Sequence, residues 1–237
     1  MPEPGFHVVT APRLEPLFDA LVDTLARDPL PPTETETVLV AQNVGLRAWL
    51  TKALADRLGC AAALDLGTPV TFASDLAQAL VQHASPGDGE RHPFDGGPLA
   101  WRLAPVLGSL PDDPAFAPLA AYLSKTGGQV MPLAKRVAAL FDDYQVYRPD
   151  VLAAWARGED PLPEFAHGAW QRALWRRLVE DGRPTLDRAS GLLALARTLR
   201  QPDERTLAQL PPRIAVFGAL LFPPLYLRIL REAAAHV

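Results

Sequence analysis

The chain has little cysteine and no histidine spacing suited to a metal. Its 237 residues include one cysteine, Cys60, and five histidines. A single cysteine excludes an intramolecular disulfide and a metal site built from several cysteines. No two histidines stand at the i, i+4 spacing that would place both on one helical face for a metal. The sequence therefore predicts neither a disulfide framework nor a metal centre.

Long apolar runs and an excess of basic charge are also absent. No apolar stretch is long enough to cross a bilayer, and the N-terminus carries no charged-then-apolar targeting signal. The formal net charge of −4 argues against a protein that coats nucleic acid by bulk electrostatics, although it leaves room for a local contact surface. A cytoplasmic protein with no membrane contact is expected.

Both ends of the chain carry short apolar runs, rich in β-branched residues, of the kind that form buried strands. Strands are expected at Phe6–Ala11, at Thr37–Gln42, within residues 61–72, where a turn follows at 67–69, and at Arg213–Gly218. Helical periodicity occurs at residues 13–26, at Val44–Leu58 before Gly59, and after the proline pair at 223–224. Alternating strands and helices predict an α/β fold with a parallel sheet.

The middle of the chain has a different pattern. Residues 73 to about 210 show almost only helical periodicity, interrupted by loops rich in proline and glycine. The simplest architecture is therefore an α/β core of residues 1–72 and 211–237, interrupted by an all-helical insertion of residues 73–210. Several tryptophans recur at helical spacing with leucine and alanine, so packing rather than base stacking is expected for Trp49, Trp101, Trp170 and Trp175.

One helix of the middle region ends in a cluster of polar residues. Its apolar face is expected to comprise Leu133, Val137, Leu140, Phe141 and Tyr144. Off that face lie Asp142, Asp143 and Gln145. Arg148 should mark the helix end because it precedes Pro149, and Asp150 is placed to cap the next helix. Adjacent helical residues point about 100° apart, which argues against an acid/base pair. Alone, this pattern predicts a solvated acidic turn in which Arg148 pairs with one carboxylate.

The loop after the first expected strand lacks the residues that hold a triphosphate. A phosphate-binding loop needs glycines, a lysine and a Ser/Thr for Mg²⁺, but residues 10–16 contain neither glycine nor lysine. The strand expected near the C-terminus runs into Phe217, Gly218 and Ala219, where an ATPase would carry acidic residues for Mg²⁺. Both halves of an ATPase site are missing, so the chain itself is predicted to be non-catalytic.

Four stretches carry a resemblance to a known family. In chain order they are TVLVAQNVGLRAWLTKALADRLG (37–59), FDDYQVYRPDVLAAWARG (141–158), AWQRALWRRLVEDG (169–182) and RIAVFGALLFPPLYLRILREAAAHV (213–237). With them the chain resembles the N-terminal part of the RecC family, the gamma subunit of exodeoxyribonuclease V. The patterns YxVYRPDxLxxW and FGxxxxPPxYLxxL are fairly specific to that family. Family members are several times longer, so an N-terminal fragment is expected.

The resemblance implies a P-loop helicase-like fold that has lost its ATPase residues. The α/β core would correspond to domain 1A of superfamily 1 and the helical insertion to a 1B-like domain. The resemblance further implies a non-catalytic, DNA-binding subunit of a RecBCD-type ATP-dependent exonuclease and helicase, which serves double-strand break repair by homologous recombination. RecB-like and RecD-like motor and nuclease subunits are the expected partners, with single-stranded and duplex-end DNA. No cofactor is expected in this chain, since ATP and Mg²⁺ belong to the partner subunits.

The resemblance also implies DNA-contacting positions, because the family's N-terminal domains line a tunnel for the 3′ strand and read the Chi sequence there. These positions fall on Thr68, Ser74, Ala139, Leu140, Asp142, Asp143, Arg148 and Arg188. Four of them agree with studied members, namely Leu140, Asp142, Arg148 and Arg188. The other four depart from the pattern, and Ser74 replaces a tryptophan that could stack on a base. A Chi-like sequence of a different kind, or none, is expected to be read.

Two other functions stay open from the sequence. The helical region could be a purely structural protein–protein interaction module that makes no contact with DNA. A divergent P-loop ATPase is the less favoured alternative, because the glycines, the lysine and the acidic residues of that site are missing.

Overall fold

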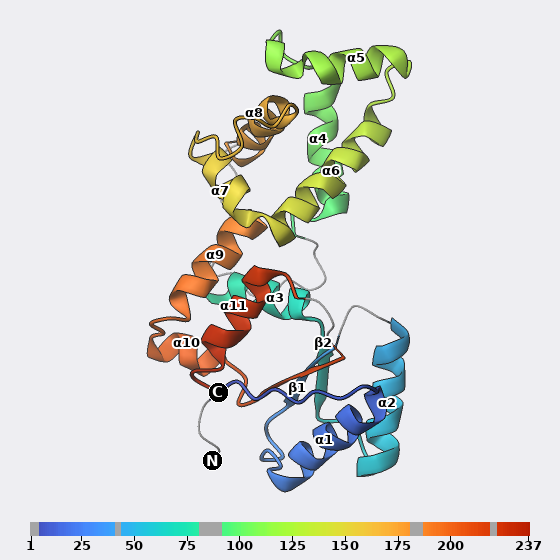
Figure 1. Ribbon diagram of the computed structural model, residues 1–237, viewed down its shortest axis with the longest axis vertical. Coiled ribbons are helices and arrows are strands. Elements are labelled where there is room, and N and C mark those ends of the chain that lie inside the picture. Colours follow the sequence, from blue (N-terminus) through green and yellow to red (C-terminus); the bar gives the residue numbers. More distant parts are fainter. Residues whose placement is uncertain (1–4, 41–43, 81–91, 181–186, 219–221) are drawn as a thin grey trace. The chain divides into compact units, whose positions relative to one another are not determined.

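The computed structural model describes residues 5–40, 44–80, 92–180, 187–218 and 222–237 (Figure 1). The chain divides into two compact units. The first comprises residues 1–83 and 194–237, and the second comprises residues 84–193. The domain boundaries predicted at residues 72 and 211 remain a prediction, because these units reflect packing alone.

The first unit contains a three-stranded parallel sheet, with strand order β2-β1-β3. The strands are β1 (Glu36–Val40), β2 (Leu64–Gly67) and β3 (Ile214–Phe217). In the central strand, Val38 lies opposite Leu66 of β2 and Ala215 of β3. Val38 and its neighbours Leu39 and Val40 are fully buried. Such a continuous apolar strand is typical of a parallel sheet that is covered on both faces.

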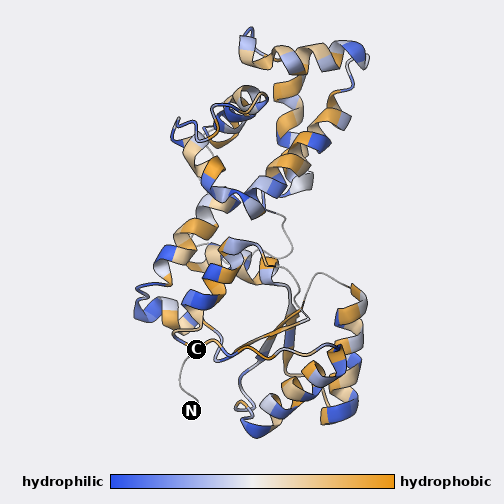
Figure 2. Cartoon of the chain, in the orientation of Figure 1, coloured by the Kyte–Doolittle hydropathy of each residue, from blue (hydrophilic) through white to orange (hydrophobic). Residues whose placement is uncertain are grey.

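Helices cover this sheet on both sides. Their bounds are α1 (Leu14–Arg27), α2 (Val44–Leu58), α3 (Pro69–Leu80), α10 (Glu204–Gln209) and α11 (Pro224–Ala233). Figure 1 shows α1 and α2 on one side of the sheet, and α3 with α10 and α11 on the other. Leu21 and Leu25 of α1, one turn apart, pack with Leu50 of α2 and Val38 of the sheet in one core cluster. Figure 2 shows the hydrophobic and hydrophilic sides of α11.

Most elements predicted for the first unit are confirmed. The strands expected at 37–42, within 61–72 and at 213–218 are β1, β2 and β3, with residues 41 and 42 outside the described residues. Helix α2 spans the predicted Val44–Leu58 and is followed by Gly59 at φ +81°, a left-handed conformation that suits glycine. The α/β class with a parallel sheet is therefore confirmed.

The strand predicted at Phe6–Ala11 is wrong. These residues form no strand, and Phe6, Val8 and Val9 are exposed. β-Branched residues favour an extended backbone, but a strand also needs a neighbour whose N–H and C=O groups complete the ladder. That neighbour cannot be read from the segment itself.

The described part of the second unit is helical and contains no strand. Its elements are α4 (Gly96–Gly108), a 3₁₀ turn η1 (Pro114–Phe116), α5 (Ala117–Lys125), α6 (Val130–Tyr147), α7 (Pro149–Ala156) and α8 (Gly168–Val179). A last helix, α9 (Arg188–Thr198), starts in this unit and continues into the first.

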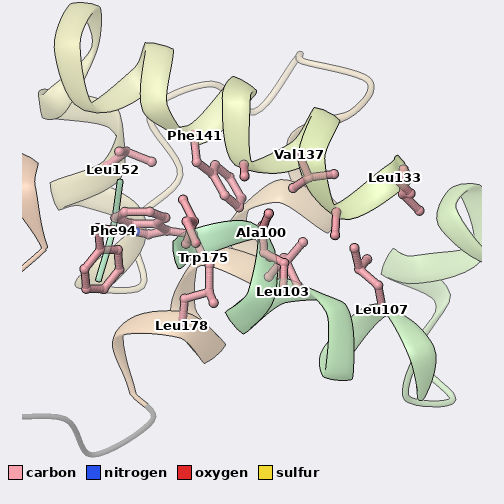
Figure 3. Close-up of a cluster of buried hydrophobic side chains, with 14 of the residues drawn as sticks. Phe94, Ala100, Leu103, Leu107, Leu133, Val137, Phe141, Leu152, Trp175 and Leu178 are labelled. Atoms are coloured by element: carbon pink, nitrogen blue, oxygen red, sulfur yellow. The ribbon is translucent and has the colours of Figure 1, made fainter. Parts of the chain in front are cut away.

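Helices α4 and α6 form the centre of the second unit's core. Figure 3 shows Leu103 and Leu107 of α4 facing Val137 and Leu133 of α6, with Trp175 of α8 at the Phe141 end of the same cluster. Each helix contributes residues three or four apart, as one packed helical face requires. Trp175 contacts the ring of Phe141 edge-on, with ring centroids 5.2 Å apart. The polar end of α6 is therefore fixed on a well-packed helix pair.

Candidate nucleic-acid interface

Arg188 is the centre of a part-buried ion-pair cluster in the second unit. Its Nη2 donates to Oδ1 of Asp142 at 2.7 Å, and its Nη1 donates to Oδ1 of Asp95 at 3.2 Å. The Arg188 side chain is only 11% exposed, whereas those of Asp142 and Asp95 are 39% and 34% exposed. Asp142 lies near the end of α6 and Asp95 directly before α4. The arginine at the start of α9 therefore ties three helices together.

Gln145 supports the same cluster from the buried side of α6. Its Nε2 donates to the carbonyl of Phe94 at 2.9 Å, and its Oε1 accepts from the backbone N–H of Arg188 at 3.2 Å. Gln145 is fully buried, so the prediction that it lies off the packed face is wrong. A buried amide is retained when both of its polar ends are hydrogen-bonded. The signal was present, because Gln145 follows buried Phe141 by four residues.

Burial changes the acidity of this cluster. It raises the pKa of the Asp142 carboxyl above the ordinary value of 3.8, and the carboxylates of Asp95 and Asp143 raise that pKa further. Arg188 opposes the shift through its charge and its hydrogen bond. Burial also lowers the pKa of nearby His92 from its ordinary 6.5. The site thus disfavours isolated charges, and Arg188 is the cation that makes an ionised Asp142 tolerable there.

Arg148 stands in a different setting, between α6 and α7. Its Nε and Nη2 each donate to one carboxylate oxygen of Asp150 at 3.1 Å, and its side chain is 48% exposed. These hydrogen bonds lower the pKa of Asp150. Arg148 ends α6 as predicted. However, the capping role predicted for Asp150 is wrong, because α7 begins at Pro149 and Asp150 lies inside its first turn.

The remaining predicted DNA-contacting positions fall in two places. Ala139, Leu140 and Asp143 lie on α6 in the second unit. Thr68 and Ser74 belong to the first unit. Thr68 directly precedes α3, and Ser74 lies in its second turn. Thr68 and Thr71 exchange backbone-to-hydroxyl hydrogen bonds of 3.0 and 3.1 Å, which close the first turn of that helix. Of the predicted DNA-contacting positions, Asp142 and Arg188 are joined by a direct hydrogen bond.

A hollow of about 370 Å³ opens beside Asp142, between α4 and α6. Its lining includes Gly96, Ala100 and Trp101 of α4 and Lys135, Ala139 and Asp142 of α6. Trp101 is 71% exposed, so the prediction that it packs in the core is wrong. Trp175 is fully buried as predicted, and Trp170 packs partly buried against the same core. The exposure of Trp101 depends on which helix faces α4, and its own spacing does not specify this.

Within residues 5–40, 44–80, 92–180, 187–218 and 222–237, no group of three or more His, Cys, Asp or Glu residues could hold a metal ion. In the same part of the chain, no helix combines the length and the apolar character that crossing a membrane requires.

Comparison with known proteins identifies one family. The family described as RecC, N-terminal domain, matches residues 6–237. The RecBCD enzyme subunit RecC of Escherichia coli (strain K12) is 32% identical over 232 residues, which cover 94% of this chain and 20% of that protein. The subunit of the same name from Mycolicibacterium smegmatis is 32% identical over 242 residues, which cover 98% of this chain and 20% of that protein. The chain thus spans about a fifth of the length of these curated relatives.

Proposed function

The chain belongs to the RecC N-terminal domain family, and from this premise we propose that it guides single-stranded DNA as a non-catalytic part of a RecBCD-type exonuclease and helicase. The assembly would act in double-strand break repair by homologous recombination. RecB-like and RecD-like subunits would supply ATP hydrolysis, Mg²⁺ and nuclease activity. This chain would contact the 3′ strand after the duplex is split, and could read a Chi-like sequence in it.

The exposed end of α6 is the observation that carries this proposal. Asp143, Tyr147 and Arg148 are all exposed there, on a helix whose other face is fixed by Phe141 and by the Arg188 cluster. Arginine suits a phosphate or a guanine edge, an aromatic ring stacks on a base, and a carboxylate accepts from a base amino group. A rigid helix end that presents these three groups is well suited to hold a single strand.

Packing at the carboxyl end of β3 supports a helicase-like core without ATPase activity. Gly218, at φ +67°, follows this strand, and a Cβ atom there would lie 2.7 Å from Cδ2 of Leu46. In P-loop motors a strand end of this kind carries the acidic residue that holds Mg²⁺. An acidic side chain does not fit at Gly218, which favours a core without ATPase activity, and we propose the helicase-like fold from the parallel sheet together with the family membership.

The test uses the full-length subunit assembled with its motor partners, and it compares two arginine variants. Arg148→Ala removes the exposed cation at the end of α6. Arg157→Ala is a matched control, because Arg157 ends α7 and contacts both oxygens of Glu159 at 2.8 Å, two residues away, as Arg148 contacts Asp150. Degradation of a DNA library by each complex is sequenced. We expect Arg148→Ala to change where the enzyme pauses or switches, and Arg157→Ala to match the wild type.

Two outcomes would contradict the proposal. If both complexes assemble and treat every sequence as the wild type does, the α6 end does not guide the strand, and the structural interaction module becomes the better description. If Arg148→Ala instead prevents assembly with the motor subunits, this surface is a protein interface. ATP hydrolysis by the isolated pure subunit would support the alternative that the chain is a divergent P-loop ATPase.

A further inference from the structure

The hollow between α4 and α6 exists because both helices present small residues there. Gly96 and Ala100 lie one turn apart on α4, and Ala139 lies opposite on α6. A Cβ atom added to Gly96 would find no other atom within 4 Å, so the space above that glycine is open. A volume of about 370 Å³ is within the range of sites that take small ligands.

Trp101 supplies a large aromatic wall that the protein leaves exposed. It is the most exposed tryptophan among those described, and folding gains little from an indole that is 71% accessible. Indole rings stack well on bases, since every base has a π-face and the contact does not depend on sequence. The exposed indole of Trp101 beside an open hollow is therefore a surface on which a flat ring can stack.

Lys135 and Asp142 give the hollow two polar ends. Lys135 is exposed one turn before Ala139 on the same stripe of α6, so its ammonium group can reach a phosphate at the rim. Asp142 uses Oδ1 to accept from Arg188, which fixes the carboxylate in place. Its other oxygen keeps lone pairs that can accept from an amino group in the hollow.

We propose that this hollow binds one unpaired nucleobase of the single strand, stacked on Trp101, with Lys135 on the adjacent phosphate. The inference rests on the proposed function, because Ala139 and Asp142 are also positions that the family resemblance assigns to DNA contact. A flat ring, an anionic neighbour and a donor for Asp142 occur together in a nucleotide. Adenine, cytosine and guanine carry an exocyclic amino group that can donate to Asp142, whereas an unpaired thymine can donate only through its ring N3–H.

The first test is photocrosslinking in the full-length subunit assembled with its motor partners. The probe is a duplex whose 3′ single-stranded tail carries 5-iodocytosine, and the crosslinked peptides are mapped by mass spectrometry. We expect a crosslink at Trp101, a loss of about tenfold in that yield for Trp101→Ala, and retention with Trp101→Phe, since the stacking surface is kept. In the Lys135→Gln complex, the salt dependence of tail binding should fall by about 0.7 in log–log slope.

Two glycines of α4 provide a matched pair of blocking variants. Gly96→Leu places a side chain in the hollow, whereas Gly108→Leu makes the same change at the other end of the same helix, where a Cβ atom also meets open space. We expect Gly96→Leu to abolish the Trp101 crosslink and Gly108→Leu to leave it intact. Equal crosslinking in both would overturn the assignment.

The remaining outcomes separate this inference from the proposed function. If Arg148→Ala alters DNA processing but no crosslink forms at Trp101, the base site is wrong while strand guidance stands. If neither Arg148→Ala nor Trp101→Ala changes DNA processing or crosslinking to the tail, the base site and strand guidance are both wrong. If Trp101→Ala weakens assembly with the motor subunits and leaves DNA contacts unchanged, the hollow receives a protein side chain and the base site is again overturned.

Discussion

Arg188 and Arg148 both contact carboxylates near the end of α6, but they do so in opposite surroundings. Arg188 is 11% exposed and bridges Asp142 and Asp95 across three helices. Arg148 is 48% exposed and contacts Asp150, two residues away in the chain. The first arginine joins distant segments, whereas the second joins neighbours that are already held by the backbone.

The difference indicates what each arginine can offer to DNA. Removing one partner of a part-buried ion pair leaves an uncompensated charge, so the side chain of Arg188 is needed to stabilise the folded state. An exposed pair contributes little, because water and salt screen it, and its arginine can exchange a carboxylate for a phosphate at small cost. Under the proposed function, Arg148 would therefore contact DNA directly, and Arg188 would act by positioning Asp142.

Removing Arg188 should have the largest effect on stability. We expect Arg188→Ala to lower the free energy of unfolding by about 2–3 kcal/mol, because Asp142 and Asp95 lose their cation in a partly desolvated place. Urea unfolding of the purified protein measures this value. A loss below about 0.5 kcal/mol would show that solvent screens the cluster as well as it screens Arg148, and the contrast between the two arginines would disappear.

Replacing Gln145 should have the next largest effect. Gln145→Leu keeps the side-chain size but leaves the Phe94 carbonyl and the Arg188 backbone N–H without their partner. Two buried polar groups without hydrogen bonds should cost about 2 kcal/mol in unfolding free energy. Amide hydrogen exchange provides a specific readout, since the Arg188 N–H should exchange faster while amides in the middle of α4 keep their protection. Unchanged exchange at Arg188 would contradict the role given to Gln145.

The two carboxylates should respond to pH in opposite directions. The pKa of Asp142 is raised, so the folded state holds that proton more tightly, and stability falls as pH rises from about 3.8 through the raised value. The pKa of Asp150 is lowered, so its contribution is present above about 3.8 and is lost as pH falls through the lowered value. The measurement is the unfolding free energy from urea denaturation at a series of pH values on both sides of 3.8. Asp142→Asn should remove the decrease in stability above pH 3.8, and Asp150→Asn should remove the decrease below it. Slopes of the same sign would contradict this assignment.

Periodicity predicted the elements that depend on local pattern. The apolar and β-branched run of β1 and the helical spacing of α2 each carry their own signal, and Arg148 before Pro149 marked the end of α6. The strand expected at Phe6–Ala11 failed because pairing needs a neighbouring strand. For Gln145 the spacing from Phe141 carried the signal of burial, but its hydrogen-bond partners Phe94 and Arg188 lie far away in the sequence. Trp101 was misplaced because its exposure depends on which helix packs against α4, and that helix, α6, lies about 30 residues further along the chain.

Removing Arg148 should have the smallest effect on stability and a clear effect on DNA. We expect Arg148→Ala to change the unfolding free energy by no more than about 0.5 kcal/mol, because the pair with Asp150 is exposed and local. Urea unfolding of the variant and the wild type measures this value. Any change in DNA processing by the Arg148→Ala complex then comes from the lost cation rather than from a loosened fold. A loss as large as that expected for Arg188→Ala would instead mean that Arg148 is also structural, and α6 would present no free arginine to DNA.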